Sequence, residues 1–302
     1  MNTLVTGGKG LVGSFIPFGL KPTKDILNLL DYQALERYIE NNNISSIIHT
    51  AAKVGGVHSN TKYVFDFFVD NLNINTNILK VCQKYSINKS LFMISTCAFP
   101  KNAQLPLQTE SLHNGEPHET NYGYAYAKRM IEVGIRSLKQ QYNLMANSII
   151  PCNLYGEYDN YHLENGHVIP GLIHKCYLAK KNNTTLEIWG SGNAEREFIY
   201  AKDIADIIDS IHKNNLYIDG PMIVSPDSII TIKEIVHNIV KIMKFNGEVY
   251  FNTTKPEGIL KKNSSNAKFR THFPDFQFTA LEEGLGKTIE YFLSNYSSVR
   301  QQ

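Results

Sequence analysis

Short apolar runs alternate along the first half of the chain with longer segments in which apolar residues recur every three or four positions. The short runs at 3–6, 46–51, 90–95 and 146–151 are typical of buried strands, and the longer segments at 32–41, 65–85 and 124–142 are typical of amphipathic helices. Strands that alternate with helices indicate a parallel sheet covered on both faces. The pattern therefore predicts an α/β fold built on a doubly wound parallel sheet of the Rossmann type.

The pattern becomes less regular beyond residue 151. It predicts helices at 168–181, 203–213, 232–244 and 281–293, a short strand at 186–189, and one strand at 222–225 that returns to the main sheet. We therefore expect residues 1–157, with returning segments near 198–226, to form a dinucleotide-binding domain. Residues 158–302 are expected to form mainly a smaller C-terminal α/β substrate domain.

Composition and charge narrow the function classes. The 302 residues include 30 basic and 28 acidic side chains, for a net charge of +2, without the concentrated basic face of a nucleic-acid binder. No apolar run is long enough to cross a bilayer, and no secretory leader precedes the first strand. The four cysteines are scattered without a C-x-x-C pair, so disulfides and a metal site are not expected. We expect a protein of the reducing cytoplasm.

A glycine-rich loop follows the first predicted strand directly. Gly7, Gly10 and Gly13 are spaced so that the backbone can turn tightly and bring its N–H groups close to a pyrophosphate. The simpler interpretation is a turn without a ligand. At the first strand–helix junction of a doubly wound pattern, the loop instead predicts a dinucleotide site, which Lys9, Leu11 and Val12 would line.

The segment after this loop is unusually short. Pro17, Gly19 and Pro22 leave no room for both a first helix and a second strand before Leu27. In this region an acidic residue would recognise a free ribose 2′-hydroxyl, and cations would bind a 2′-phosphate. Asp25 is the acidic candidate, and the basic candidates are Lys9, Lys21 and Lys24. The excess of lysines favours NADPH over NADH.

Polar residues with chemical potential follow the strand at 90–95. Ser95 and Cys97 are placed at the carboxyl end of what we expect to be the fourth strand, where ligands of parallel sheets bind. Tyr124 and Lys128 lie four residues apart and share one face of a helix. An isolated pair of this kind is usually a packed ring with a lysine reaching to solvent. Together with Ser95 and the glycine loop, it is typical of short-chain dehydrogenases/reductases, in which the phenol protonates the alkoxide formed by hydride transfer.

A narrower resemblance rests on motifs that cover most of the chain from Leu27 onward. AAKVGGV (51–57), STCAFP (95–100), YAYAK (124–128), CNLYGEYDNY (152–161), NGHVIPGLI (165–173), IWGSGNAEREFIYAKD (188–203) and KPEG (255–258) occur in the order found in the GDP-L-fucose synthase family. The chain closely resembles that family. The resemblance implies an extended short-chain-reductase fold and a homodimer. It also implies NADPH-dependent conversion of GDP-4-keto-6-deoxy-mannose to GDP-L-fucose, by epimerisation at C3 and C5 and reduction at C4.

The resemblance also implies roles for individual residues. The family's acid–base pair for epimerisation corresponds to Cys97 and His167, and a thiol and an imidazole both titrate near neutrality. The remaining assignments fall into two groups. Contacts to the GDP-sugar are assigned to Lys175, Trp189, Arg196 and Lys255, and contacts to the coenzyme to Ala51, Ala52, Lys128 and Asn153. Lys175 replaces the arginine that is usual in the family.

Two stretches depart from the family pattern near the expected sugar site. MIVSPDS (222–228) replaces a glycine-rich stretch, and KKNSS (261–265) lacks the usual acidic residue. The alternative is therefore a C4-reductase acting on a related GDP-6-deoxy-4-keto sugar such as a heptose, with epimerisation by another protein. A 4,6-dehydratase would carry an acidic pair where Cys97 and Ala98 stand. A coenzyme sensor without turnover would have lost the tyrosine–lysine pair.

Overall fold

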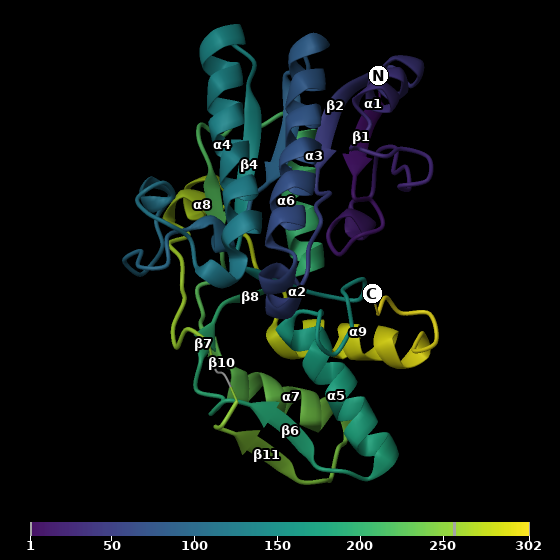
Figure 1. The fold of residues 1–302 in the computed structure, drawn as a ribbon, viewed down its shortest axis with the longest axis vertical. Coiled ribbons are helices and arrows are strands. Elements are labelled where there is room, and N and C mark those ends of the chain that lie inside the picture. Colours follow the sequence, from purple (N-terminus) through teal and green to yellow (C-terminus); the bar gives the residue numbers. More distant parts are fainter. Residues whose placement is uncertain (1, 256–257, 302) are drawn as a thin grey trace.

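The computed structural model describes residues 2–255 and 258–301 and has a parallel sheet at its centre. Five strands lie in the order β1 (Asn2–Thr6), β2 (Ile44–His49), β3 (Lys89–Met93), β4 (Ala146–Pro151) and β9 (Met222–Val224), and every neighbouring pair is parallel (Figure 1). The doubly wound parallel sheet expected from the alternation of strands and helices is confirmed. The strand expected at 222–225 lies at the edge of this sheet.

Both faces of the sheet are covered by helices. Along the strands of this sheet, neighbouring residues belong to opposite core clusters, as Ile47 and Ile48 do in β2. One cluster is completed by α1 (Tyr32–Asn41), α3 (Val64–Lys84) and α4 (Tyr122–Tyr142), and the other by α6 (Ala201–Lys213) and α8 (Ala267–His272) (Figure 1). This burial on both sides explains why the strands read as nearly continuous apolar runs.

The segment between the first two strands is as short as its prolines predicted. After the glycine loop, the chain forms a single 3-10 turn, η1 (Gly13–Phe15), and then one bridge between Leu20 and Leu4 in place of a strand. The strand that leads to Ser95 is therefore the third of the sheet, and our expectation that it is the fourth is wrong. The physical reason is that Pro17 and Pro22 cannot supply the backbone donors of a regular ladder.

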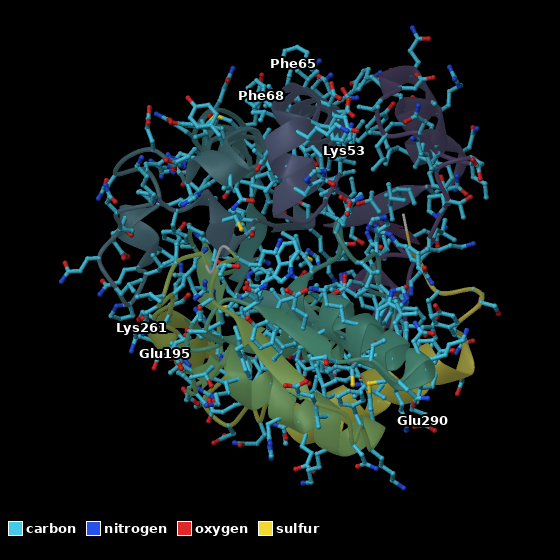
Figure 2. All side chains as sticks on the ribbon, turned by 60° about the horizontal axis from the view of Figure 1, so that its bottom comes forward. Lys53, Phe65, Phe68, Glu195, Lys261 and Glu290 are labelled. Atoms are coloured by element: carbon cyan, nitrogen blue, oxygen red, sulfur yellow. The ribbon has the colours of Figure 1, made fainter. Side chains whose placement is uncertain are left out.

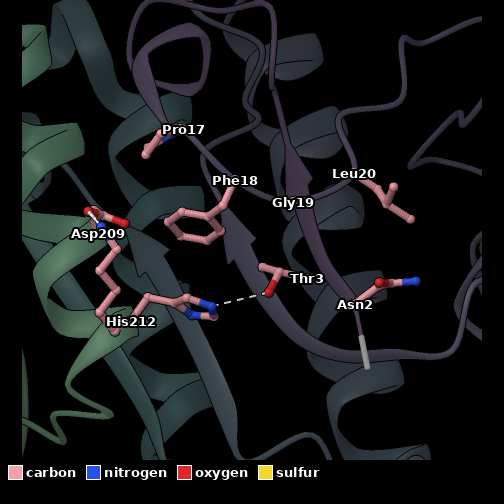
Figure 3. A pocket seen from close by; sticks show the side chains of 9 residues that line it. Asn2, Thr3, Pro17, Phe18, Gly19, Leu20, Asp209 and His212 are labelled. Atoms are coloured by element: carbon pink, nitrogen blue, oxygen red, sulfur yellow. Dashed lines mark hydrogen bonds and ion pairs between the residues drawn. The ribbon is translucent and has the colours of Figure 1, made fainter.

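A cavity of about 560 Å³ lies at the amino end of β1, beside this shortened segment. Phe18 stacks on His212 of α6 with ring centroids 4.4 Å apart, and the His212 Nε2 atom lies 3.2 Å from the Thr3 hydroxyl (Figure 3). The cavity is therefore at the opposite end of the sheet from Ser95. Ligands of parallel sheets bind at the carboxyl ends of the strands, where Ser95 lies.

The second half of the chain forms a smaller layered unit below the sheet in Figure 1. Its strand pairs are β5 (Asn153–Tyr155) with β8 (Phe198–Tyr200), β6 (Leu186–Trp189) with β11 (Val249–Asn252), and β7 (Glu195–Arg196) with β10 (Ile230–Thr231). Helices α5 (Val168–Asn182), α7 (Ile232–Met243) and α9 (Leu281–Ser294) pack around a core that includes Tyr161, Ile173, Ile188, Ile235 and Phe292.

Candidate active site

The glycine loop forms a compact turn that only glycine can adopt at two positions. Gly7 has φ of +68°, and a Cβ there would lie 2.8 Å from the Ala51 backbone nitrogen. A Cβ at Gly13 would lie 2.2 Å from the Gly7 carbonyl oxygen, which also accepts a hydrogen bond of 2.8 Å from the Gly10 N–H. The turn therefore packs against the end of β2, where Ala51 and Ala52 follow. This glycine-lined cradle fits a pyrophosphate.

The side chains around the loop divide into exposed and buried groups. Lys9, Lys24 and Asp25 are exposed, so all three remain candidates for recognising the adenosine ribose. Lys21 instead lays its stem over Gly8 and donates a hydrogen bond to the Ile16 carbonyl, and burial lowers its pKa. Lys21 therefore braces the shortened segment.

Two of the predicted loop residues turn inward. Val12 is buried in the core, and Leu11 is half-buried beside Gly156. Val12 can therefore contact a coenzyme only through its backbone.

Tyr124 and Lys128 meet at the start of α4 as their spacing predicted. The Lys128 Nζ atom lies 5.9 Å from the centre of the Tyr124 ring and donates a hydrogen bond of 2.9 Å to the Met93 carbonyl at the end of β3. Burial lowers the pKa of Lys128 to about 8. Burial also raises the pKa of Tyr124, with a smaller contribution from Cys97, whereas a hydrogen bond with Ser95 lowers it. The phenol is therefore protonated at neutral pH, as a proton donor must be.

The segment that carries Ser95 and Cys97 is held from several directions. The Ser95 hydroxyl accepts a hydrogen bond of 3.2 Å from the Cys97 N–H and so caps the 3-10 helix η2 (Thr96–Ala98). The Arg129 guanidinium donates two bonds, of 3.0 and 2.6 Å, to the Ala98 carbonyl. From the other side, the Lys262 ammonium donates a bond of 3.0 Å to the Thr96 carbonyl. The polar edge of the site is therefore fixed by two cations that sequence reasoning did not assign to it.

His167 stands at the N-cap of α5 and pairs with a carboxylate. Its Nδ1 atom lies 2.9 and 3.2 Å from the two carboxylate oxygens of Asp159. This carboxylate raises the pKa of His167 against the lowering effect of partial desolvation, and Cys97 raises it further. Cys97 thus interacts electrostatically with both Tyr124 and His167, so the structure brings the predicted catalytic residues together. Their roles stay predictions.

A buried chain of hydrogen bonds joins the coenzyme edge of the sheet to α4. The Thr6 hydroxyl lies 2.8 Å from His49 Nδ1, and His49 Nε2 lies 3.1 Å from the Asn75 side-chain oxygen. The Asn75 amide donates to the Ala127 carbonyl at 3.0 Å, one residue before Lys128. Burial, aided by the Lys128 charge, lowers the pKa of His49 to about 3, so its imidazole is neutral. No local sequence pattern indicated this arrangement.

Two of the cations assigned to the GDP-sugar lie beside the only tryptophan of the sequence. The Lys175 and Lys255 ammonium groups lie 4.7 and 5.6 Å from the centre of the Trp189 indole. Trp189 is 52% exposed. Arg196 donates hydrogen bonds to the Glu195 and Ile259 carbonyls. The nearby Glu195–Lys261 ion pair is 3.0 Å long (Figure 2). Residues 256–257 of the KPEG motif lie outside the described residues.

A buried glutamate lies under the remaining coenzyme candidate. The Asn153 amide donates a bond of 2.8 Å to the Glu197 carbonyl, and a Glu197 carboxylate oxygen accepts a bond of 3.0 Å from the Ser264 N–H. Burial raises the pKa of Glu197 to about 7, although Ser264 and the Lys262 charge oppose the shift. Glu197, which directly precedes β8, therefore ties Asn153 to the segment that also positions Lys262. Sequence reasoning missed Glu197, because its importance depends on burial.

Comparison with known proteins places this geometry in a family. Residues 21–223 match the NAD dependent epimerase/dehydratase family. GDP-L-fucose synthase from Dictyostelium discoideum is 40% identical, over 99% of this chain and 97% of that protein. The chain belongs to the GDP-L-fucose synthase family. A probable member from Drosophila melanogaster is 35% identical over 99% of both chains. The crystal structure of a GDP-L-fucose synthetase from Naegleria fowleri bound to NADP superposes with a TM-score of 0.91 at 34% identity, covering 99% of this chain and 94% of that one.

Membership of the GDP-L-fucose synthase family confirms the resemblance that the motifs indicated. Within the part of the chain that the structure describes, no helix is long and apolar enough to cross a membrane. The same residues contain no group of three or more His, Cys, Asp or Glu side chains placed to hold a metal ion. The cysteines other than Cys97 are buried, as expected of packing residues.

Proposed function

We propose that this protein converts GDP-4-keto-6-deoxy-mannose to GDP-L-fucose, by epimerising C3 and C5 and reducing C4 with NADPH. One observation carries the proposal. Cys97 is close enough to interact electrostatically with both His167 and Tyr124, so the two residues proposed for proton transfer at carbon share one site with the Tyr124–Lys128 pair proposed for ketone reduction. Relatives named GDP-L-fucose synthase at 35–40% identity over the whole chain support the same activity.

The coenzyme is proposed to bind in the cradle formed by Gly7, Gly10 and Gly13, next to Ala51 and Ala52. The exposed ammonium groups of Lys9 and Lys24 would favour a 2′-phosphate, so NADPH is proposed over NADH. When bound, NADPH supplies the hydride that reduces C4. The relative of known structure named as bound to NADP supports this choice.

Reduction requires a proton for the oxygen at C4, and Tyr124 is proposed to donate it. Its phenol is protonated because burial raises the pKa, and the Lys128 ammonium one helical turn away stabilises the phenolate left behind. The Ser95 hydroxyl, fixed by its contact with the Cys97 N–H, would hold the ketone oxygen in place.

Epimerisation uses the same ketone in a different way. The C4 carbonyl acidifies the hydrogens on C3 and C5, so a base can remove each of them to form an enediolate. We assign Cys97 as the base and His167 as the acid that returns a proton to the opposite face. The Asp159 carboxylate favours protonated His167, and this supports the assignment.

The diphosphate is proposed to bind between cations contributed by three segments of the smaller unit. Lys175 and Lys255 lie beside Trp189, and Arg196 lies on strand β7. Because Lys175 is a point charge, its phosphate contact would be less directional than a bidentate arginine contact.

One experiment separates this function from the alternative of C4 reduction alone. GDP-4-keto-6-deoxy-mannose is incubated with the protein in deuterated water without coenzyme, and deuterium at C3 and C5 is measured by NMR. Incorporation is expected, and a Cys97→Ser variant should lose it by about 10²–10⁴-fold while still oxidising NADPH with the ketone. A wild-type protein that incorporates no deuterium but reduces the ketone would establish the C4-reductase, on this sugar or on a related heptose.

We also propose a homodimer that forms through α3 and α4. On these helices Phe65 is 73% exposed, and Tyr122 and Val133 are each more than 40% exposed, as is Tyr63 at the N-cap of α3. Figure 2 shows Phe65 and Phe68 on the outer side of α3. A second copy would cover this apolar surface. Light scattering would test it, because Phe65→Glu should yield monomers.

The division of the chain and its compartment are likewise proposals. A boundary near residue 157, with 198–226 returning to the first domain, is supported by the position of β9 in the main sheet and by a separate core cluster around α5, α7 and α9. Action in the cytoplasm is supported by four cysteines that are all free thiols.

A further inference from the structure

Asp159 is an almost completely buried carboxylate with a definite set of partners. Its side chain is 3% exposed, and its two oxygens lie 2.9 and 3.2 Å from His167 Nδ1. One of these oxygens also accepts a hydrogen bond of 2.7 Å from the Asn160 N–H. An ionised carboxylate is costly to bury unless it is paired, so the partner charge on His167 matters for both residues.

The loop that joins the two residues is fixed at several points. The Asn165 carbonyl accepts a bond of 2.8 Å from the Gly56 N–H, and the Asn165 side-chain oxygen accepts one of 2.7 Å from the Ser59 hydroxyl. The Tyr161 N–H donates to the Arg300 carbonyl at 2.8 Å. The carboxylate is therefore a stationary acceptor for an imidazole that stands at the start of α5.

This contact determines which imidazole nitrogen remains available. Because His167 Nδ1 faces Asp159, its N–H donates to the carboxylate, and Nε2 points away from it. The His167 side chain is 44% exposed, so part of the ring remains accessible. The geometry is that of a carboxylate that orients an imidazole and stabilises its protonated form.

The charges around His167 act in both directions. The Asp159 carboxylate, as the largest cause, and Cys97 raise the pKa of His167, whereas partial desolvation of the ring and the Arg300 charge lower it, and the net shift is upward. Removing this carboxylate would therefore leave burial and Arg300 opposed only by Cys97.

We propose that Asp159 is a positioning residue for epimerisation, which holds His167 with Nε2 directed at the sugar and keeps it protonated until it returns a proton to carbon. This inference rests on the proposed function. It assigns a task to a residue that lies within the motif CNLYGEYDNY but for which the motif itself suggested none.

The test combines Asp159→Asn with a measurement on His167 itself. Asn preserves the acceptor for the Asn160 N–H but removes the charge. Histidine-labelled protein is titrated by NMR, and the rate of deuterium incorporation at C3 and C5 is measured on the keto-sugar. We expect the His167 pKa to fall and the exchange rate to drop about 10–100-fold, with the remaining activity shifted to lower pH.

Two further variants make the result specific. Glu164→Gln removes an exposed carboxylate from the same loop and should leave the His167 titration and the exchange rate within about twofold of the wild type. The double variant Asp159→Asn with His167→Gln should exchange no more slowly than His167→Gln alone, because Asp159 acts through His167.

Several outcomes would overturn the inference. These are an unchanged His167 pKa in folded Asp159→Asn, or losses that add in the double variant. If Asp159→Asn does not fold, the NMR titration of the wild type decides. A neutral His167 that carries its proton on Nε2 could not donate from Nδ1 to Asp159, and this result would overturn the inference. A wild type without deuterium exchange would instead defeat the proposed epimerase function, while the titration would still report on the Asp159–His167 pair.

Discussion

Lys128 and Arg129 are adjacent on α4 and bind backbone carbonyls on the two sides of the reacting segment. Lys128 donates to the Met93 carbonyl at 2.9 Å before Ser95, and Arg129 donates to the Ala98 carbonyl after Cys97. Both side chains are buried, which is unusual for cations and is offset here by these bonds. The helix that carries the phenol therefore also fixes the strand end that carries the hydroxyl and the thiol.

Arg129→Met should destabilise the fold and slow both epimerisation and ketone reduction. The Ala98 and Gly115 carbonyls would lose their guanidinium donor, at a cost of about 1–3 kcal/mol for each acceptor left unpaired. Urea unfolding and the two activities measure the effect. Lys139→Met is the matched control, because Lys139 is exposed on the same helix and pairs at the surface with the exposed Asp219, so its loss should leave stability and both activities nearly unchanged. Equal effects of the two substitutions would contradict the role given to Arg129.

Tyr124→Phe should stop ketone reduction and leave carbon exchange intact. The substitution keeps the buried ring beside Lys128 but removes the hydroxyl that donates the proton, so NADPH oxidation should fall by at least about 10²-fold. Deuterium incorporation at C3 and C5, which relies on Cys97 and His167, should persist. Tyr122→Phe is the control, since Tyr122 is 42% exposed and should be dispensable. Loss of exchange together with reduction would show that the two steps do not separate.

Reduction by the free enzyme should decline above about pH 8. Burial lowers the pKa of Lys128 to about 8, so the ammonium that stabilises the phenolate is present below this pH and is lost as the pH rises through it. Tyr124 does not account for such a decline, because its pKa is raised above its usual value of 10. The measurement is kcat/KM for NADPH oxidation between pH 6 and 10. A profile that stays level to pH 10 would mean that the Lys128 charge is not required.

The elements that follow from local pattern were predicted well. Residues 186–189 form the expected strand, and the Tyr124–Lys128 contact follows from helical spacing alone. The short strands β5 and β11 were missed because each has only three or four residues and pairs with a distant segment, as Val249 does with Leu186. Helix α2 (Val57–Lys62) was missed because its sequence, VHSNTK, is largely polar.

The parts of the site that depend on burial and tertiary contact could not be predicted. Lys262 reaches the Thr96 carbonyl across 166 positions of sequence, and no spacing rule connects them. Asp159 lies only eight residues before His167, but a sequence does not reveal that its carboxylate is buried and faces the imidazole. For the same reason, the prolines at 17 and 22 predicted that no regular helix follows the glycine loop. They did not predict that the Lys21 ammonium would turn back and donate a hydrogen bond to the Ile16 carbonyl.

Glu197→Gln should make the protein's stability less dependent on pH. Burial raises the pKa of Glu197 to about 7 from 4.5, so between these values the folded state keeps a proton that the unfolded chain has released. Stability therefore decreases as the pH rises through this window, by at most about 3 kcal/mol. Gln retains an acceptor for the Ser264 N–H without a charge.

Urea unfolding at pH 5 and pH 8 tests this difference. The wild type and a Glu290→Gln control, which changes an exposed residue of α9, should lose stability between the two pH values by the same amount. Glu197→Gln should lose less, because the buried carboxylate that must ionise is gone. Parallel losses in all three proteins would show that Glu197 ionises at its ordinary pKa, and that the Lys262 charge and the Ser264 hydrogen bond fully offset its burial.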